Sequence, residues 1–307
     1  MNAESAVLIP RLARLPGVAV PTVSIIVPVY KSSATLVELD ARLNRVLDKY
    51  GVTFETIFVN DACPSGSIDV LNKIVLQNND SIAISLQRNV GQQRAVLTGL
   101  SFALGKTVVV MDADLQDPPE AIPKLLDALK PPYQAAFTTR RGSFESPGRM
   151  LTSRIFKWLV HVLTGIPKNV GMFVALKRPM VDALLELETA TPYMLGMIGF
   201  TNRPTTAVTV TRPVRASGQS AYTPWKRLRA GATAFLVVLG YRLRRRKSVR
   251  TSWRNTVQIA SCIQNVSEPD QSHSVIDNGP VPKLNRTPTL DPICKADIRR
   301  SAAPLSL

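Results

Sequence analysis

Short apolar runs alternate with helix-spaced apolar patterns from residue 23 to residue 139, and this alternation restricts the chain to few architectures. Val23–Val29 is a run typical of a buried strand, and Thr35–Tyr50 carries leucines at helical spacing. An α/β fold follows, with a mostly parallel central sheet flanked by helices and functional loops at the carboxyl ends of the strands. Strands are also expected at 54–59, 82–86, 107–111 and 134–139, and helices at 67–77, 92–104 and from 119 to 129.

Composition divides the chain into four parts. Residues 1–20 are expected to form a flexible leader, without the long apolar core of a signal peptide. Residues 21–222 hold the strand and helix patterns and form the expected folded domain. Residues 223–250 form a basic amphipathic segment, and residues 251–307, rich in Pro, Ser and Asn, are expected to be a disordered tail.

The positive charge is concentrated in one block. The chain has a net charge of +16, and residues 201–250 carry 12 basic side chains and no acidic one. Such a block attracts nucleic acid or the anionic inner face of a membrane, unless it is only a solvated surface. The apolar stretch within it, 230–241, is shorter than the roughly 20 residues that span a bilayer, so peripheral binding is expected. Residues 149–165 show a helical apolar stripe that fits core packing or an interfacial helix.

The small numbers of cysteines and histidines and the absence of a glycine-rich loop argue against several kinds of site. Three scattered cysteines and two histidines argue against a disulfide framework, a zinc site and a Ser-His-Asp triad, and they fit the reducing cytoplasm. A soluble nucleotidyltransferase is the nearest enzyme alternative. It would need a glycine-rich loop after the first strand, where this chain has Tyr30-Lys31-Ser32-Ser33.

Three aspartates lie within six positions directly after the fourth expected strand, in the segment MDADLQDPPE, which spans Met111–Glu120. Residues two apart on an extended segment face the same way, so Asp112 and Asp114 are expected to converge on one hard cation, Mg²⁺ or Mn²⁺. Asp117, before two prolines, instead fits a helix cap. Asp61 closes the second strand, where it would bind a ribose or a base, or simply form a turn with Asn60.

With these residues in view, the chain resembles family 2 glycosyltransferases over roughly residues 22–230, in particular the polyprenyl-phosphate branch that includes dolichyl-phosphate mannose synthase. MDADLQDPPE is the most specific motif. The other motifs are individually less specific, but together they follow one another in the order expected for the family. The resemblance rests on Val23–Tyr30, Val59–Asp61, Arg88–Gln92, Met111–Glu120, Glu145-Ser146 with Arg149 and Ser153, and Arg215–Tyr222.

The resemblance implies a role for each matching residue. Catalysis is expected to depend on Asp112, Asp114 and Arg149, and the metal on Asp112, Asp114 and Gln116. Nucleotide contacts are expected from Pro28, Tyr30, Glu38, Asp61 and Gln116. The acceptor phosphate is expected to bind Arg140, Arg149, Ser153, Arg215 and Ser220.

The implied activity is an inverting transfer of a sugar from a UDP- or GDP-sugar to undecaprenyl or dolichyl phosphate. It would take place at the cytoplasmic membrane face, in glycan or cell-envelope biosynthesis, with Mg²⁺ or Mn²⁺ and no nucleic-acid partner. The chain departs from the family at Lys31, where Asn is usual, and at Val174, where a basic residue is usual. The alternatives are a nucleotidyltransferase-like enzyme, an inactive relative and a basic nucleic-acid-binding protein. The oligomeric state is left open.

Overall fold

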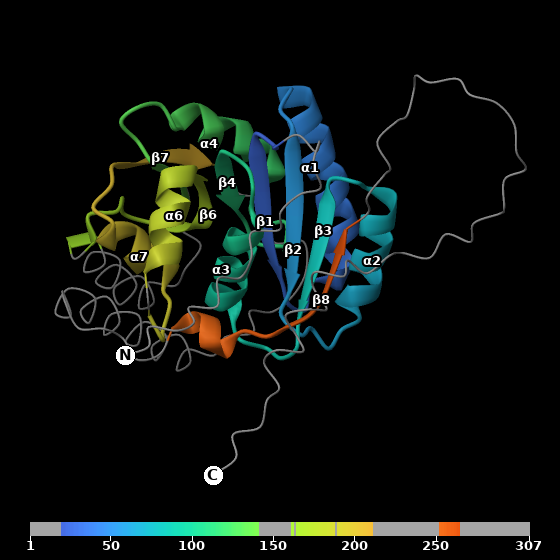
Figure 1. Ribbon diagram of the computed structural model, residues 1–307. Coiled ribbons are helices and arrows are strands. Elements are labelled where there is room, and N and C mark those ends of the chain that lie inside the picture. Colours follow the sequence, from blue (N-terminus) through green and yellow to red (C-terminus); the bar gives the residue numbers. More distant parts are fainter. Residues whose placement is uncertain (1–19, 141–160, 163, 188, 211–251, 265–307) are drawn as a thin grey trace, which may run out of the picture.

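Strands and helices alternate along the first half of the chain in the expected order (Figure 1). The computed structural model describes residues 20–140, 161–162, 164–187, 189–210 and 252–264. Its elements are β1 (Val23–Val29), η1 (Ser33–Thr35), α1 (Leu36–Tyr50), β2 (Phe54–Asn60), α2 (Ser67–Gln77), β3 (Ser81–Leu86), α3 (Gln92–Phe102), β4 (Thr107–Val110), η2 (Pro119–Ala121), α4 (Ile122–Ala128), β5 (Ala135–Arg140), β6 (Val170–Lys177), α6 (Arg178–Glu186), α7 (Met194–Phe200), β7 (Thr205–Val210), η3 (Trp253–Thr256) and β8 (Ile259–Gln264).

These strands form one 8-stranded sheet in the order β7-β5-β6-β4-β1-β2-β3-β8 across the described residues. β1 pairs in parallel with β2 and β4, β2 with β3, and β5 with β7. β6 runs antiparallel between β4 and β5, and β8 runs antiparallel to β3. The predicted α/β fold with a mostly parallel sheet is therefore confirmed, with two antiparallel strands added to it.

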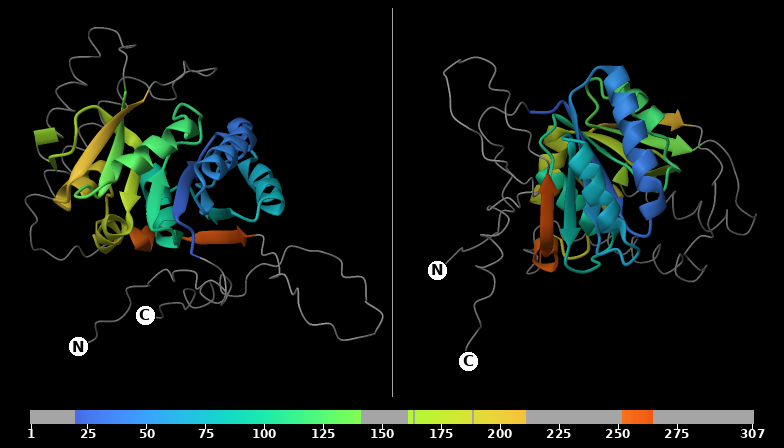
Figure 2. Two further views of the ribbon diagram at one scale, coloured as in Figure 1. Left: turned by 90° about the horizontal axis from the view of Figure 1, so that it is seen from above. Right: turned by 90° about the vertical axis from the view of Figure 1, so that its right-hand side faces the viewer.

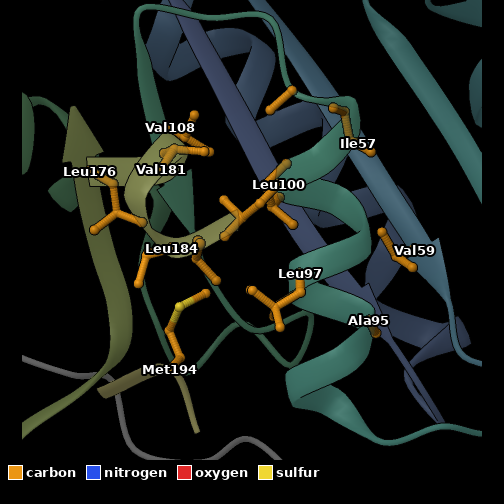
Figure 3. Close-up of a cluster of buried hydrophobic side chains, with 14 of the residues drawn as sticks. Ile57, Val59, Ala95, Leu97, Leu100, Val108, Leu176, Val181, Leu184 and Met194 are labelled. Atoms are coloured by element: carbon orange, nitrogen blue, oxygen red, sulfur yellow. The ribbon is translucent and has the colours of Figure 1, made fainter. Parts of the chain in front are cut away.

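Helices cover both faces of the sheet (Figure 2). α1, α2 and α4 pack on the face to which β1 contributes Val23, Ile25, Val27 and Val29. α3, α6 and α7 pack on the opposite face, where Ile26 lies in their cluster. Figure 3 shows part of this second cluster, formed by side chains of α3, α6 and the adjoining strands. The burial of β1 on both faces explains why its sequence is almost entirely apolar, with Ser24 as the polar exception.

Gly99 allows α3 to lie directly against the sheet. A Cβ atom at this position would overlap the Cγ2 atom of Ile26 in β1 and would lie 3.2 Å from the Cγ2 atom of Val59 in β2. Only a residue without a side chain permits this approach. The close packing fixes the helix whose first residues reach the candidate site described below.

The segment 252–264 is part of the fold, which corrects the expectation of a disordered tail from residue 251. Trp253 is 1% exposed and belongs to the cluster under α3, α6 and α7. The Arg254 guanidinium donates a 2.7 Å hydrogen bond to the carbonyl of Leu185 at α6, and β8 extends the sheet beyond β3. The apolar residues of this segment show no regular spacing from which a strand could be predicted. The strand forms by pairing with β3, which lies far away in the sequence.

Several predictions fall on residues that the structure does not describe. They include the leader before residue 20, most of the helix expected at 149–165, and the basic segment 223–250. Among the described residues, no helix is both long and apolar enough to cross a bilayer.

Candidate active site

The loops after the parallel strands meet at one edge of the sheet, which we call the carboxyl edge. β1 lies between β4 and β2, so the strand order reverses at the β1–β4 boundary. In open α/β sheets such a reversal leaves a crevice for ligands. The loops that follow β1 and β4 flank this point, and the sequence predicts functional side chains in both of them.

The aspartate loop, Met111–Pro118, leaves β4 at this position. Met111 and Ala113 are buried, Asp112 is half-buried and Asp114 is exposed. β4 ends at Val110, one residue earlier than predicted, and Asp114 lies in a turn, so the two carboxylates are not on the continuous extended segment expected from the sequence. Leu115 follows with a left-handed backbone, φ +58°.

Hydrogen bonds from two other elements fix this loop. The side-chain amide of Gln92, at the start of α3, donates to Oδ1 of Asp112 at 2.6 Å. The hydroxyl of Thr35, ahead of α1, donates to the carbonyl of Ala113 at 2.6 Å. Within the loop, Oδ1 of Asp114 accepts the backbone N–H of Gln116 at 3.1 Å. The aspartate loop is therefore held on two sides, with Asp114 at its exposed tip.

The predicted metal ligands have the right chemistry for a hard cation. Asp112, Asp114 and Gln116 offer carboxylate and amide oxygens, which Mg²⁺ and Mn²⁺ prefer. No group of three or more His, Cys, Asp or Glu side chains suited to a metal occurs in the described part of the chain. The two carboxylates and one amide would leave other coordination positions of a cation to substrate oxygens and water.

Asp61 lies at the end of β2 and is only 3% exposed. Its Oδ1 accepts the N–H of Val90 at 2.7 Å and its Oδ2 accepts the N–H of Gly91 at 3.0 Å. Burial raises the pKa of this carboxyl, and the two backbone hydrogen bonds oppose the rise. Asp61 thus braces the turn before α3, while its contact with a nucleotide stays a prediction.

The other predicted nucleotide contacts surround the loop after β1. Pro28 is half-buried within β1, and Tyr30 follows the strand with 44% of its surface exposed. The ammonium of Lys31 lies 5.5 Å from the centre of the Tyr30 ring. Glu38 is on the first turn of α1, where its exposed carboxylate forms a 3.3 Å ion pair with Arg42.

Cys63, in the loop after β2, was not singled out as a site residue by its sequence. Its sulfur accepts a hydrogen bond from the backbone N–H of Lys31 at 3.0 Å and one from the Ser67 hydroxyl at 3.1 Å, and it lies 2.9 Å from the Ser65 hydroxyl oxygen. Partial burial opposes ionisation, but these contacts outweigh it and lower the pKa of Cys63 to about 7. The two serines that follow the cysteine are the only sequence signal for this cluster.

The predicted acceptor residues lie mostly outside the described chain. Arg149, Ser153, Arg215 and Ser220 are in segments that the structure does not describe, and Arg140 is described by its backbone alone, at the end of β5. β5 and β7 run in the same direction as β4, because β6 is antiparallel to both β4 and β5. β5 and β7, which precede residues 141–160 and 211–251 in the sequence, therefore both end at the carboxyl edge.

Val174, which stands where the resemblance leads one to expect a basic residue, is in the core. It is fully buried in β6, where it pairs with Val110 of β4 and Phe137 of β5. A charged side chain would be costly in this apolar environment. A valine at position 174 is therefore compatible with its apolar surroundings in this chain.

Comparison with known proteins places these features in context. Residues 24–179 match the family model described as "Glycosyl transferase family 2". The chain is 33% identical over 206 residues to an "Uncharacterized glycosyltransferase" of Synechocystis sp., which covers 66% of this chain and 65% of that protein. It is 33% identical over 208 residues to the undecaprenyl-phosphate 4-deoxy-4-formamido-L-arabinose transferase of Pseudomonas syringae pv. syringae, covering 66% and 61%. The chain thus spans just under two thirds of the length of these relatives.

Solved structures share the architecture. Glucosyl-3-phosphoglycerate synthase from Mycobacterium tuberculosis, in complex with Mn²⁺, UDP and phosphoglyceric acid, superposes with a TM-score of 0.55 at 19% identity, covering 74% of this chain and 80% of that one. A mannosyltransferase from Pyrobaculum calidifontis, in complex with GDP-Man and Mn²⁺, gives 0.50 at 18% identity, covering 75% and 66%. At such identities the likeness establishes the fold, and it confirms the predicted GT-A-type architecture.

Proposed function

The chain belongs to glycosyl transferase family 2, and on that basis we propose that it transfers a sugar from a nucleoside-diphosphate sugar to a polyprenyl phosphate, with inversion at the anomeric carbon. The donor would be a UDP- or GDP-sugar and the acceptor undecaprenyl or dolichyl phosphate. Named relatives such as the Pseudomonas syringae enzyme support the class of acceptor. The structures in complex with UDP or GDP-Man support the class of donor.

The aspartate loop is the observation that carries this proposal. Two carboxylates, Asp112 and Asp114, stand where the strand order reverses, and Gln92 and Thr35 hold their loop in place. Beside them, the loop after β1 offers the exposed ring of Tyr30, suited to stack against a nucleobase. A diphosphate would then lie between the two loops.

Asp112, Asp114 and Gln116 would hold a divalent cation together with the donor diphosphate. When bound, Mg²⁺ or Mn²⁺ supplies positive charge that stabilises the leaving nucleoside diphosphate. The protein contributes the oxygen ligands and keeps Asp112 oriented through Gln92. Asp61 supports this arrangement by accepting hydrogen bonds from the turn that precedes Gln92.

The acceptor phosphate needs little acid–base assistance. Its second pKa is about 6, so an anionic oxygen is present at neutral pH. That oxygen would form a bond to the anomeric carbon while the bond from this carbon to the diphosphate oxygen breaks, and the electron pair leaves with the nucleoside diphosphate. Arg140, Arg149, Ser153, Arg215 and Ser220 would align the phosphate through charge-assisted hydrogen bonds. His161, whose Nδ1 lies 2.7 Å from the Ile166 carbonyl, is not required for this step.

We place the reaction at the cytoplasmic membrane face, with the basic block as the peripheral contact. Residues 211–251 connect β7 with η3. β7 ends at the carboxyl edge, and the Gln258 carbonyl accepts the N–H of Gln87 just beyond the carboxyl end of β3. Both attachments of this segment are therefore on the side of the aspartate loop. Each basic residue near an anionic leaflet can add about 1 kcal/mol to binding.

A transfer assay with the full chain tests the proposal. The enzyme, in detergent with Mn²⁺ or Mg²⁺, is incubated with a panel of labelled UDP- and GDP-sugars and either a polyprenyl phosphate or the matching polyprenyl alcohol. We expect labelled lipid from one donor and only with the phosphate acceptor. Absence of transfer from every donor in the panel, by protein that melts cooperatively, would contradict the proposal, as would equal transfer to the alcohol.

A further inference from the structure

Gln92 is the first residue of α3, and its side chain reaches across to the aspartate loop. Its Nε2 donates to Oδ1 of Asp112 at 2.6 Å, although Gln92 itself is exposed. A short hydrogen bond from an exposed glutamine to a half-buried carboxylate requires that both backbones be held in place, because freely rotating side chains gain little from such a contact.

The backbone before Gln92 is fixed from the β2 side. Gly91 adopts φ +88°, a conformation that favours glycine, and its N–H binds Asp61. Asn89 adds a bond from its side-chain amide to the Asp61 carbonyl at 3.2 Å. The carbonyl of Gly91 accepts the N–H groups of Arg94 and Ala95, which begins the helix. The position of Gln92 is therefore set by the end of β2.

Gln93 and Arg94, the two residues after Gln92, also fix the first turn of α3. Oε1 of Gln93 accepts the N–H of Met194, the first residue of α7, at 2.7 Å. The Arg94 guanidinium donates to the carbonyl of Ala190 at 2.7 Å and to that of Val90 at 3.2 Å. The first turn of α3 thus joins β2, α7 and the aspartate loop, and Gln92 makes the contact with the loop.

We propose that Gln92 is a positioning residue for the metal-binding carboxylate of Asp112. The inference rests on the proposed function, which assigns a cation to Asp112 and Asp114. An amide donor limits rotation of the carboxylate without cancelling its charge, whereas a lysine or arginine at this distance would compete with the cation. Residues that orient metal ligands in this way change metal affinity about 10–100-fold when they are removed.

The test measures metal binding directly. Free Mn²⁺ is titrated by electron paramagnetic resonance in the presence of saturating UDP or GDP, for the wild-type chain, Gln92→Met and Gln77→Met. Methionine keeps the length of glutamine but donates no hydrogen bond. Gln77 is an exposed residue at the end of α2 and serves as the matched control. We expect Mn²⁺ affinity to fall about 10–100-fold in Gln92→Met, with the control unchanged.

Two readouts separate positioning from folding. The melting temperature of Gln92→Met should stay close to that of wild type, since Gln92 is exposed and is not part of the hydrophobic core. Transfer activity of the variant should recover when Mn²⁺ is raised, with kcat near the wild-type value. A Mn²⁺ affinity within about twofold of wild type would overturn the inference, as would a loss of kcat that added metal cannot restore.

Asp112→Ala distinguishes this inference from the proposed function. If Asp112→Ala abolishes Mn²⁺ binding while Gln92→Met leaves it intact, only the role of Gln92 fails. If Asp112→Ala binds Mn²⁺ as the wild-type chain does, or if the wild-type chain binds none with either nucleotide, the metal site of the proposed function fails and the inference with it.

Discussion

The guanidinium of Arg42 forms a bidentate ion pair with the carboxylate of Glu120. Nε lies 2.9 Å from Oε1 and Nη2 lies 2.6 Å from Oε2. Arg42 is on α1 and Glu120 is in η2, directly after the aspartate loop. The pair therefore ties the far end of that loop to the helix that follows β1.

We expect Arg42→Gln to destabilise the fold by up to about 1 kcal/mol, because the Glu120 side chain is 54% exposed and solvent weakens the pair. The hydrogen bond from Arg42 holds the pKa of Glu120 below its ordinary value of 4.5. The stabilisation should thus be complete above pH 4.5 and disappear as the pH falls through the lowered pKa. Urea unfolding of wild type and variant at neutral and acid pH measures this.

Glu38→Gln is the matched control for this pair. Glu38 contacts Arg42 through one oxygen at 3.3 Å and is 62% exposed, so its removal should cost less than the removal of Arg42. A stability difference between wild type and Arg42→Gln that is the same at both pH values would contradict the assignment.

Gly99→Ala tests the contact between α3 and the sheet. The added methyl group would overlap Ile26 in the core, so α3 must move or the side chains must repack, at a cost of about 1–3 kcal/mol. Chemical denaturation measures the loss. Ser101→Ala, a change of similar size on the same helix, should cost less than Gly99→Ala, and an equal cost for the two would argue against the close packing.

Cys63 should react with alkylating agents as a thiol of pKa about 7. In a chain carrying Cys262→Ser and Cys294→Ser, the iodoacetamide rate should reach half its maximum near pH 7 and level off above it, because the thiolate is the nucleophile. Ser67→Ala, which removes one hydrogen bond to the sulfur, should move the midpoint upward. A midpoint at or above the ordinary value of 9.0 would show that the cluster does not stabilise the thiolate.

Trp253→Ala tests whether residues 252–264 belong to the folded domain. Removing this fully buried side chain should cost about 3–5 kcal/mol. Trp253→Phe retains most of the packing and should cost less. If unfolding by urea is unchanged in Trp253→Ala, the segment does not contribute to the core.

The sequence was sufficient to predict the features that depend on local pattern. The leucines of α1 and the apolar run of β1 have the periodicity of their elements, and the aspartate loop follows a buried strand. The two carboxylates were placed at the correct edge of the sheet. Their exact setting was not predicted, because β4 ends at Val110 and the loop turns at Ala113 and Asp114.

Other features depend on contacts between distant residues, which no local pattern reveals. The structural role of Asp61, which accepts N–H groups from a turn some 30 residues later, could not be predicted from the sequence around it. β8 becomes a strand only by pairing with β3. The role of Gln92 depends on a partner 20 residues away, Asp112, that the fold brings next to it.

Calorimetric titration of UDP and GDP, with and without Mn²⁺, tests the central claim most directly, that Asp112 and Asp114 bind a cation together with a nucleoside diphosphate. The wild-type chain should bind one nucleotide much more tightly with Mn²⁺ than without it. Asp114→Ala should lose that gain, whereas Asp69→Ala, at an exposed aspartate of α2, should keep it. Equal gains in Asp114→Ala and wild type would contradict the claim.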